Sequence, residues 1–301
     1  ESYVVKKLVE NGWVEGSNSH YDPVRALYPE DVVDWIKTSQ PEAWEKLVRL
    51  NGGDVEKAVL DRLEKALAAK SGGTMKVLRQ GFDMAGCGNI AMGQAAPEDE
   101  RNSKEVEKYQ SNILRVVRQL KYCPTREWAI DLGFFINGIP VATIELKTDF
   151  TQAIDDAIWQ YKRDRLPQDP QTKRKEPLLT FKRGAVVHFA MSDSEVAMTT
   201  HLNGDKSFFL PFNKGNDGHA GNKPRNDGEY PVAYFWEEIC QRDAWLRIFH
   251  SFVYVETKDK VDKLGMPYKA ETLIFPRYHQ FAAVNSMIAD AKALGPGQQY
   301  L

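Results

Sequence analysis

The feature that most constrains the fold is a pair of apolar segments joined by Asn137-Gly138, in the stretch AIDLGFFINGIPVATIELK over residues 129–147. An Asn-Gly pair between two such segments is a strong signal for a tight turn between antiparallel strands. The sequence therefore predicts strands over 128–136 and 140–147.

Three charges interrupt this apolar hairpin. Alternate residues place one set of side chains on a core face: Ile130, Leu132, Phe134 and Ile136 on the first strand, and Ala142, Ile144 and Leu146 on the second. The opposite face then carries Asp131, Glu145 and Lys147, with Val141 and Thr143 between them. All three charges are expected to point the same way.

The charge pattern also constrains the strand register. A strict two-residue turn would place Asp131 opposite Ile144 and mix the two faces. A three-residue loop over 137–139, or an equivalent bulge, pairs Phe135 with Val141 and Asp131 with Glu145.

Two carboxylates on adjacent strands repel each other unless a cation lies between them. Mg²⁺ binds such oxygen ligands, so Asp131 and Glu145 are the candidate metal ligands. Lys147 could then position the attacking water or stabilise charge in the transition state, which is chemistry suited to phosphodiester hydrolysis. The simpler reading is a hairpin with surface charges. A second Glu-x-Lys, at Glu256 and Lys258, has Asp243 upstream, but no hairpin turn joins them.

Elsewhere, periodicity and breaker residues predict alternating helices and strands. Helices are expected over 1–12, 29–50, 55–69, 153–165 and 233–247, and further strands over 113–122, 185–190 and 195–200. Residues 84–104 and 213–230 are expected to be irregular, and a linker-like stretch begins at about 255.

Composition excludes several classes of protein. The 301 residues carry a net charge of −2, and the three cysteines form no CxxC pair, which argues against a disulfide framework or a zinc site. No apolar run is long enough for a membrane helix or a signal peptide, so a cytoplasmic protein with no membrane partner is expected. Residues 162–183 hold eight basic and three acidic side chains. This segment is either a solvated surface or a surface that faces phosphate.

The triad of Asp131 and Glu145-Leu146-Lys147 resembles that of the PD-(D/E)xK nucleases, in which Ile130 here replaces the usual proline. More widely, the chain resembles the N-terminal part of the restriction (R) subunit of type I restriction-modification enzymes. The resemblance rests on VLRQGFDMAGCGN, YQSNILRVVRQLKY, FFINGIPVATIELK, AIWQYKRDR, VVHFAMSDSEVAMTT, FLPFNKG and LIFPRYHQ.

The resemblance implies an α/β fold, in which a mixed central sheet is flanked by helices. It implies an endonuclease domain over 1–254, with a helical part over 1–83, a nuclease core at about 105–200 and a Gly-rich loop and helix over 213–247. Residues 255–301 would be a linker and the start of a helicase-like, ATP-dependent motor domain.

The implied activity is Mg²⁺-dependent cleavage of double-stranded DNA, with methyltransferase and specificity subunits as partners. Gln280 in LIFPRYHQ would contact the adenine of ATP in the full subunit. The 301 residues contain no GxxxxGK[ST] sequence and therefore no complete ATP site.

The resemblance also implies supporting residues. An acidic residue early in the first helix falls on Glu1, with Glu107 as the alternative. The family's Gln-x-x-x-Tyr motif keeps Tyr161, but Ala157 replaces the glutamine and Gln160 is adjacent, with Arg165 on the same helical face as Tyr161. The alternative function is an inactive docking or DNA-positioning module that links a motor domain to a methyltransferase complex.

Overall fold

The computed structural model describes residues 1–99, 101–148, 153–262 and 265–295. Its centre is a mixed sheet of seven strands in the order β1-β4-β5-β6-β7-β8-β9. These strands are β1 (Val14–Gly16), β4 (Leu114–Lys121), β5 (Ala129–Ile136), β6 (Ile139–Leu146), β7 (Val187–Met191), β8 (Val196–Thr199) and β9 (Leu210–Pro211). The β1–β4 and β6–β7 pairs are parallel, and the other neighbours are antiparallel.

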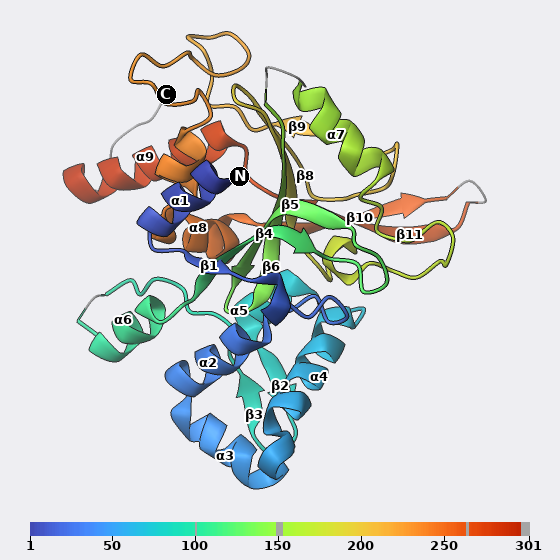
Figure 1. Ribbon diagram of the computed structural model, residues 1–301. Helices are drawn as coiled ribbons and strands as arrows, with labels where there is room; N and C mark the ends of the chain where they lie inside the picture. The colour runs from blue at the N-terminus through green and yellow to red at the C-terminus, as the bar shows by residue number, and fades with distance from the viewer. Residues whose placement is uncertain (100, 149–152, 263–264, 296–301) are drawn as a thin grey trace.

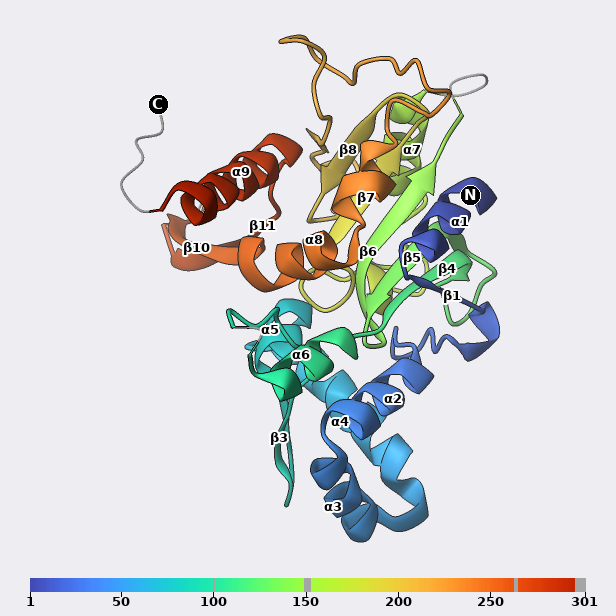
Figure 2. The ribbon, with the colours of Figure 1, turned by 90° about the vertical axis from the view of Figure 1, so that its left-hand side faces the viewer.

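The α-helices of the described residues are α1 (Ser2–Glu10), α2 (Pro29–Ser39), α3 (Pro41–Asn51), α4 (Val55–Ala68), α5 (Thr74–Gln80), α6 (Ser103–Gln110), α7 (Ile154–Arg163), α8 (Arg242–Arg247) and α9 (Tyr278–Leu294). Some of them cover the two faces of the sheet. Figure 1 shows α7 on one side of the sheet and α1 and α8 on the other. Helices α2 to α4 form a lobe below the sheet (Figure 2). The mixed sheet with flanking helices confirms the predicted fold class.

Both faces of the central hairpin are buried, and each belongs to a separate apolar cluster. Leu132, Phe134 and Ile144 pack in the larger cluster with α1 and the helical lobe. Phe135 packs with α7 residues in the smaller cluster. Two side chains were assigned to the wrong face: Ile130 lies in the smaller cluster, and Val141 lies in the larger one.

The hairpin turn explains the position of Val141. Asn137 and Gly138 have φ angles of 50° and 79°, the left-handed values of a two-residue turn, and Ile136 pairs with Ile139. Phe135 pairs with Pro140 and Phe134 with Ala142, so Val141 is the extra residue of a bulge. The predicted pairing of Phe135 with Val141 is therefore wrong.

The equivalent bulge, which was the alternative, is correct. Beyond it Leu132 pairs with Ile144, so Asp131 and Glu145 occupy the next positions along their two strands.

Replacing Gly138 with alanine should destabilise the protein strongly. A Cβ there would lie 2.4 Å from the Tyr28 carbonyl oxygen and 2.8 Å from the Val32 nitrogen. The left-handed backbone alone costs a non-glycine residue about 1–3 kcal/mol. Urea denaturation should show a loss of at least this size for Gly138→Ala. The control is Gly53→Ala, since a Cβ at Gly53 meets nothing within 4 Å. Equal stability of the two variants would contradict this account of the turn.

The N-terminal region differs from the prediction in three elements. The expected helix over 29–50 is divided into α2 and α3 at Gln40-Pro41, because proline disfavours helical geometry in the residue before it. Residues 14–16 form strand β1 at the sheet edge, although the first quarter was expected to be helical. Strands β2 (Phe82–Met84) and β3 (Gly88–Ile90) form a small hairpin that begins the segment expected to be irregular.

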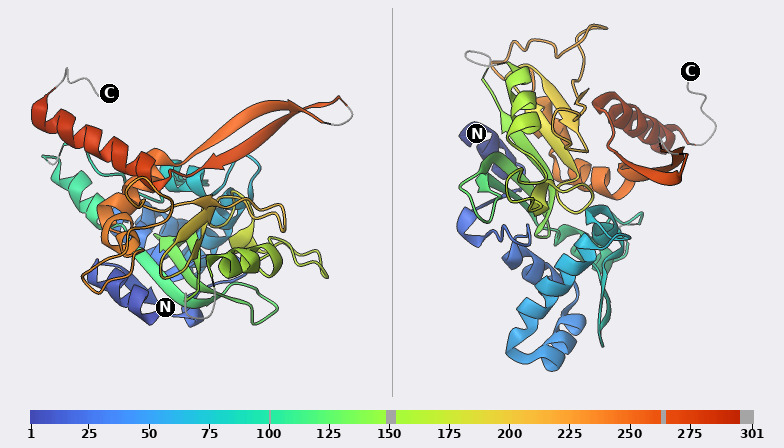
Figure 3. Two further views of the ribbon diagram at one scale, coloured as in Figure 1. Left: turned by 90° about the horizontal axis from the view of Figure 1, so that it is seen from above. Right: turned by 90° about the vertical axis from the view of Figure 1, so that its right-hand side faces the viewer.

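The C-terminal region also differs. The helix expected over 233–247 is broken into a π-helix (Phe235–Ile239) and α8, and a second π-helix (Ile248–Phe252) follows α8. The expected linker is a regular hairpin of β10 (Tyr254–Val261) and β11 (Pro267–Ile274), which projects from the body in Figure 3. Residues 263–264 and 296–301 of the segment 255–301 lie outside the described residues. The division into two domains stays a prediction.

Within the described part of the chain, no helix has the length and apolar character needed to cross a membrane.

Candidate active site

Asp131 lies on β5 with its carboxylate fixed by two hydrogen bonds. Its Oδ2 accepts a bond of 2.7 Å from the backbone N–H of Leu146, at the end of β6. Its Oδ1 accepts a bond of 3.1 Å from Nε2 of Gln119 on β4. Gln119 has a φ of 46°, so the backbone of β4 departs from regular strand geometry at this residue. Three adjacent strands therefore hold the Asp131 carboxylate in place.

Glu1 lies across Gln119 from Asp131. The same Gln119 amide donates a bond of 2.6 Å to Oε1 of Glu1. The structure thus brings the N-terminal glutamate beside Asp131. The alternative, Glu107, lies on α6, whose C-terminal end leads to Asn112. Asn112 bonds to Asn137 in the hairpin turn, at the other end of β5 from Asp131.

Glu145 on β6 is fully buried, with a side-chain exposure of 0%. Its Oε1 accepts a hydrogen bond of 2.6 Å from Nε of Arg165, which follows α7. Its Oε2 has no hydrogen-bond partner among the described residues. Burial raises the pKa of Glu145 to about 8; the Arg165 guanidinium opposes this rise, and the Asp131 carboxylate adds to it. The site therefore holds a carboxyl that is costly to ionise without a further cation.

Lys147 follows the last residue of β6, and its backbone N–H bonds to the Met191 carbonyl at 2.9 Å. Its side chain lines a pocket of about 250 Å³ together with Glu1, Tyr3 and Trp236. Among the described residues, no carboxylate forms an ion pair with the Lys147 ammonium. Lys147 therefore faces a pocket that also reaches the Glu1 side of the site.

Two of the supporting residues, Tyr161 on α7 and Arg165 just after it, contact residues of the sheet. Tyr161 is fully buried, and its hydroxyl lies 2.8 Å from Oγ1 of Thr143. Gln160 is half-buried, and its Oε1 has no hydrogen-bond partner in the described structure. Arg165 is also turned inward, with 12% of its side chain exposed. Tyr161 and Arg165 thus do not form the phosphate-facing pair expected from their helical spacing, and their roles stay predictions.

The donor set suits a hard divalent cation. Asp131 and Glu145 supply carboxylate oxygens, and the buried, unpartnered Oε2 of Glu145 is an acceptor that a cation would satisfy. Arg165 already occupies the other oxygen. Across residues 1–99, 101–148, 153–262 and 265–295, no cluster of three or more His, Cys, Asp or Glu side chains is arranged to hold a metal. Any cation here would therefore rely on two carboxylates plus water or phosphate oxygens.

Gln280 lies near the start of α9, far along the chain from this site. Its Oε1 accepts a bond of 2.9 Å from the Arg277 backbone N–H, which caps the helix. It also lines a pocket of about 390 Å³ with Thr200 and Phe208. Its predicted contact with adenine is untested.

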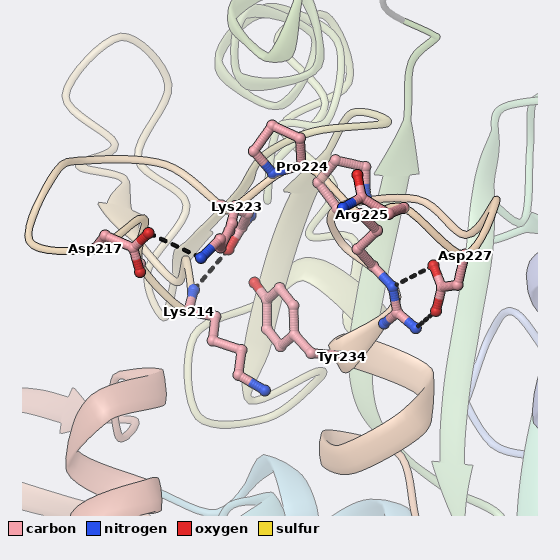
Figure 4. Close-up of a pocket in the computed structure, with 11 residues that line it drawn as sticks. Lys214, Asp217, Lys223, Pro224, Arg225, Asp227 and Tyr234 are labelled. Atoms are coloured by element: carbon pink, nitrogen blue, oxygen red, sulfur yellow. Dashed lines mark hydrogen bonds and ion pairs between the residues drawn. The ribbon is translucent and has the colours of Figure 1, made fainter.

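The Gly-rich segment 213–230 is irregular, as predicted, and forms a larger pocket of about 660 Å³. Figure 4 shows two of its cations, Lys223 and Arg225, close to carboxylates. Lys223 pairs with Asp217 at 2.8 Å, and Arg225 pairs with Asp227 at 2.5 Å. Because these charges are already neutralised, this pocket is a weaker candidate site than the Asp131 region.

Sequence reasoning missed two contacts. Gln119 was assigned to a strand without a role, although it bridges Glu1 and Asp131. Arg165 is predicted from its helical spacing to face phosphate beside Tyr161, whereas in the structure it pairs with Glu145. The excess of basic residues after α7 gave only a general signal for the second contact.

Comparison with known proteins gives one match. The family model described as "Type I restriction enzyme R protein N terminus" matches residues 32–207, which is more than half of the chain and includes both strands of the hairpin. A search of curated proteins found no match. The matched segment holds Asp131 and Glu145 within a sheet of the expected kind, with Lys147 directly after it, and on this match the chain belongs to the family of type I restriction enzyme R protein N-terminal regions.

Proposed function

We propose that this chain is a Mg²⁺-dependent endonuclease domain that hydrolyses phosphodiester bonds of double-stranded DNA. The observation that carries the proposal is the placement of Asp131 and Glu145 at neighbouring positions of β5 and β6, with Lys147 following at the pocket. Family membership adds support, because restriction enzymes act on DNA.

Each residue has a distinct proposed role. Asp131 and Glu145 would hold the cation, and the Leu146 N–H and Gln119 amide keep the Asp131 carboxylate oriented. When bound, Mg²⁺ would supply charge stabilisation for the phosphate. Lys147 would orient the attacking water or stabilise charge on the phosphate oxygens. In the full subunit, ATP-driven translocation by a motor domain and assembly with methyltransferase and specificity subunits would bring DNA to this site.

One observation favours a second candidate, the inactive docking or DNA-positioning module. Arg165 already pairs with Glu145, with 12% of the arginine side chain and 0% of the glutamate side chain exposed. Such a pair can stabilise a carboxylate without a metal. If this were its only role, Mg²⁺ would not bind at Asp131 and Glu145.

Mg²⁺ binding separates the two candidates. Titration calorimetry should detect Mg²⁺ binding to the wild-type chain, and Asp131→Asn should weaken it, because the substitution removes one charged ligand while keeping an oxygen for the Leu146 N–H. High Mg²⁺ should partly restore DNA cleavage by Asp131→Asn. The control is Asp34→Asn, the same chemical change at an exposed position of α2. Unchanged Mg²⁺ affinity in Asp131→Asn, or no binding to the wild type, would favour the docking module.

A further inference from the structure

The segment after α7 folds into a compact loop, which we call the basic loop (residues 167–176). Gln168 and Lys175 form an isolated antiparallel bridge. The Asp169 N–H bonds to the Arg174 carbonyl at 2.8 Å, and the Glu176 N–H bonds to the Pro167 carbonyl at 2.9 Å. The loop is thus closed by its own backbone hydrogen bonds.

Asp169 anchors the basic loop from inside. This residue is 1% exposed, and its Oδ1 accepts the backbone N–H groups of Gln171 at 2.7 Å and Thr172 at 3.1 Å. Its Oδ2 lies 3.0 Å from Nη2 of Arg126, whose guanidinium stacks over the Trp128 ring at 4.5 Å. These contacts fix the loop to the segment between β4 and β5, so its shape is set before any ligand binds.

The basic loop presents three consecutive cations, Lys173, Arg174 and Lys175, all of them exposed. Within the described residues, none of the three takes part in an ion pair. Four of the other five basic side chains of the segment 162–183 are engaged: Arg163 pairs with Asp205, Arg165 with Glu145 and Lys182 with Glu271, and Arg183 is buried. The fifth, Lys162, lies on α7 and is half-buried. The basic loop thus holds three neighbouring exposed cations that form no ion pair within the described residues.

The loop lies close to the candidate active site. It begins two residues after Arg165, the partner of Glu145. Trp128, Arg165 and Pro170 line one pocket of about 280 Å³. Trp128 immediately precedes β5, on which Asp131 lies. A long anion bound near Asp131 and Glu145 could thus extend over the loop.

We propose that the basic loop binds the phosphate backbone of the DNA duplex beside the bond to be cleaved. Protein partners usually require an apolar centre in the interface, but residues 168–175 (QDPQTKRK) contain no aliphatic or aromatic side chain apart from Pro170. Unpaired cations on a fixed loop suit phosphate oxygens, which carry no sequence information. This inference rests on the proposed function only in taking DNA as the substrate.

The test is the salt dependence of duplex DNA binding by the 301-residue chain in EDTA, where no cleavage occurs. The triple variant Lys173→Ala/Arg174→Ala/Lys175→Ala should reduce the slope of log K against log salt by about 3 and weaken binding roughly 100-fold at 0.1 M salt. The loss should be the same on unrelated DNA sequences.

The matched control is Lys46→Ala/Arg49→Ala/Lys65→Ala, which removes two lysines and one arginine from exposed positions of α3 and α4. This control should leave the slope nearly unchanged, and both variants should keep the wild-type melting temperature.

Equal losses of DNA affinity in the two triple variants would show a general charge effect and overturn the proposal. An unchanged slope in the loop variant, or no DNA binding by the wild type, would also overturn it. If DNA binding depends on the loop but the protein never cleaves DNA, this inference is supported and the proposed nuclease function is contradicted.

Discussion

Lys147→Ala should lower the rate of DNA cleavage by the assembled restriction enzyme by about 10²–10³, the loss expected when one positioned donor to a transition state is removed. ATP-driven translocation by the full subunit should stay nearly intact, because Lys147 lies outside the segment 255–301 that is predicted to begin a motor domain. Stability should barely change, since Ile144 keeps its place in the larger core cluster and Leu146 stays packed against it. A plasmid-cleavage assay run beside a translocation assay over a Mg²⁺ series would measure this, and raised Mg²⁺ should not rescue the variant.

The chain offers a matched control in Lys258. Lys258 follows Glu256 at the same spacing as Lys147 follows Glu145, and it lies on β10 in an exposed ion pair with Glu256 of 2.9 Å. Lys258→Ala should cleave like the wild type. Normal DNA cleavage by Lys147→Ala would contradict the nuclease proposal and favour the inactive docking module. Simultaneous loss of cleavage and translocation would indicate failed folding or assembly.

Arg165→Ala should destabilise the chain by about 3 kcal/mol at alkaline pH in the absence of Mg²⁺, because removing one partner of a buried pair leaves an uncompensated charge. The guanidinium is 12% exposed and the Glu145 carboxylate 0%. Arg163→Ala is the control. Its ion pair with Asp205 is more than half exposed on both sides, and such pairs contribute less than about 1 kcal/mol.

The loss should depend on pH in a defined direction. The pKa of Glu145 is raised from 4.5 to about 8, mainly by burial. Because the pKa is higher in the folded than in the unfolded state, the contribution of Glu145 to the free energy of unfolding is complete below pH 4.5 and is lost as the pH rises toward 8. Without Arg165, which opposes the rise of this pKa, the loss of stability should continue to higher pH.

Urea denaturation of Arg165→Ala in EDTA should therefore show a loss of only about 1 kcal/mol near pH 6, where Glu145 is protonated and a single hydrogen bond is lost. The full loss should appear above pH 8. A loss independent of pH, or an equal loss in Arg163→Ala, would mean that the Arg165 pair does not control the ionisation of Glu145.

Much of the central hairpin could be predicted from the sequence, because its signals are local. Alternation of apolar residues along 129–136 and the Asn137-Gly138 pair specify two strands and a tight turn. The position of the charges even required a register shift, and the bulge at Val141 supplies it. Helix α7 and strands β7 and β8 were found in the same way, since each has its own periodicity.

The tertiary structure decided what surrounds the two carboxylates. Glu1, Gln119 and Asp131 meet because α1 packs against β4, which pairs with β5. No periodicity within one segment encodes such a contact between distant segments. Arg165 turns inward to Glu145 because the buried carboxylate requires a partner, which spacing on a helix cannot reveal. Likewise, the sequence by itself determined that the segment 162–183 is basic. Only the tertiary structure decided which of its cations form internal ion pairs and which, in the basic loop, stay exposed. The physical reason is that ion pairing depends on distances between side chains, and these distances are set by the closed loop and the sheet.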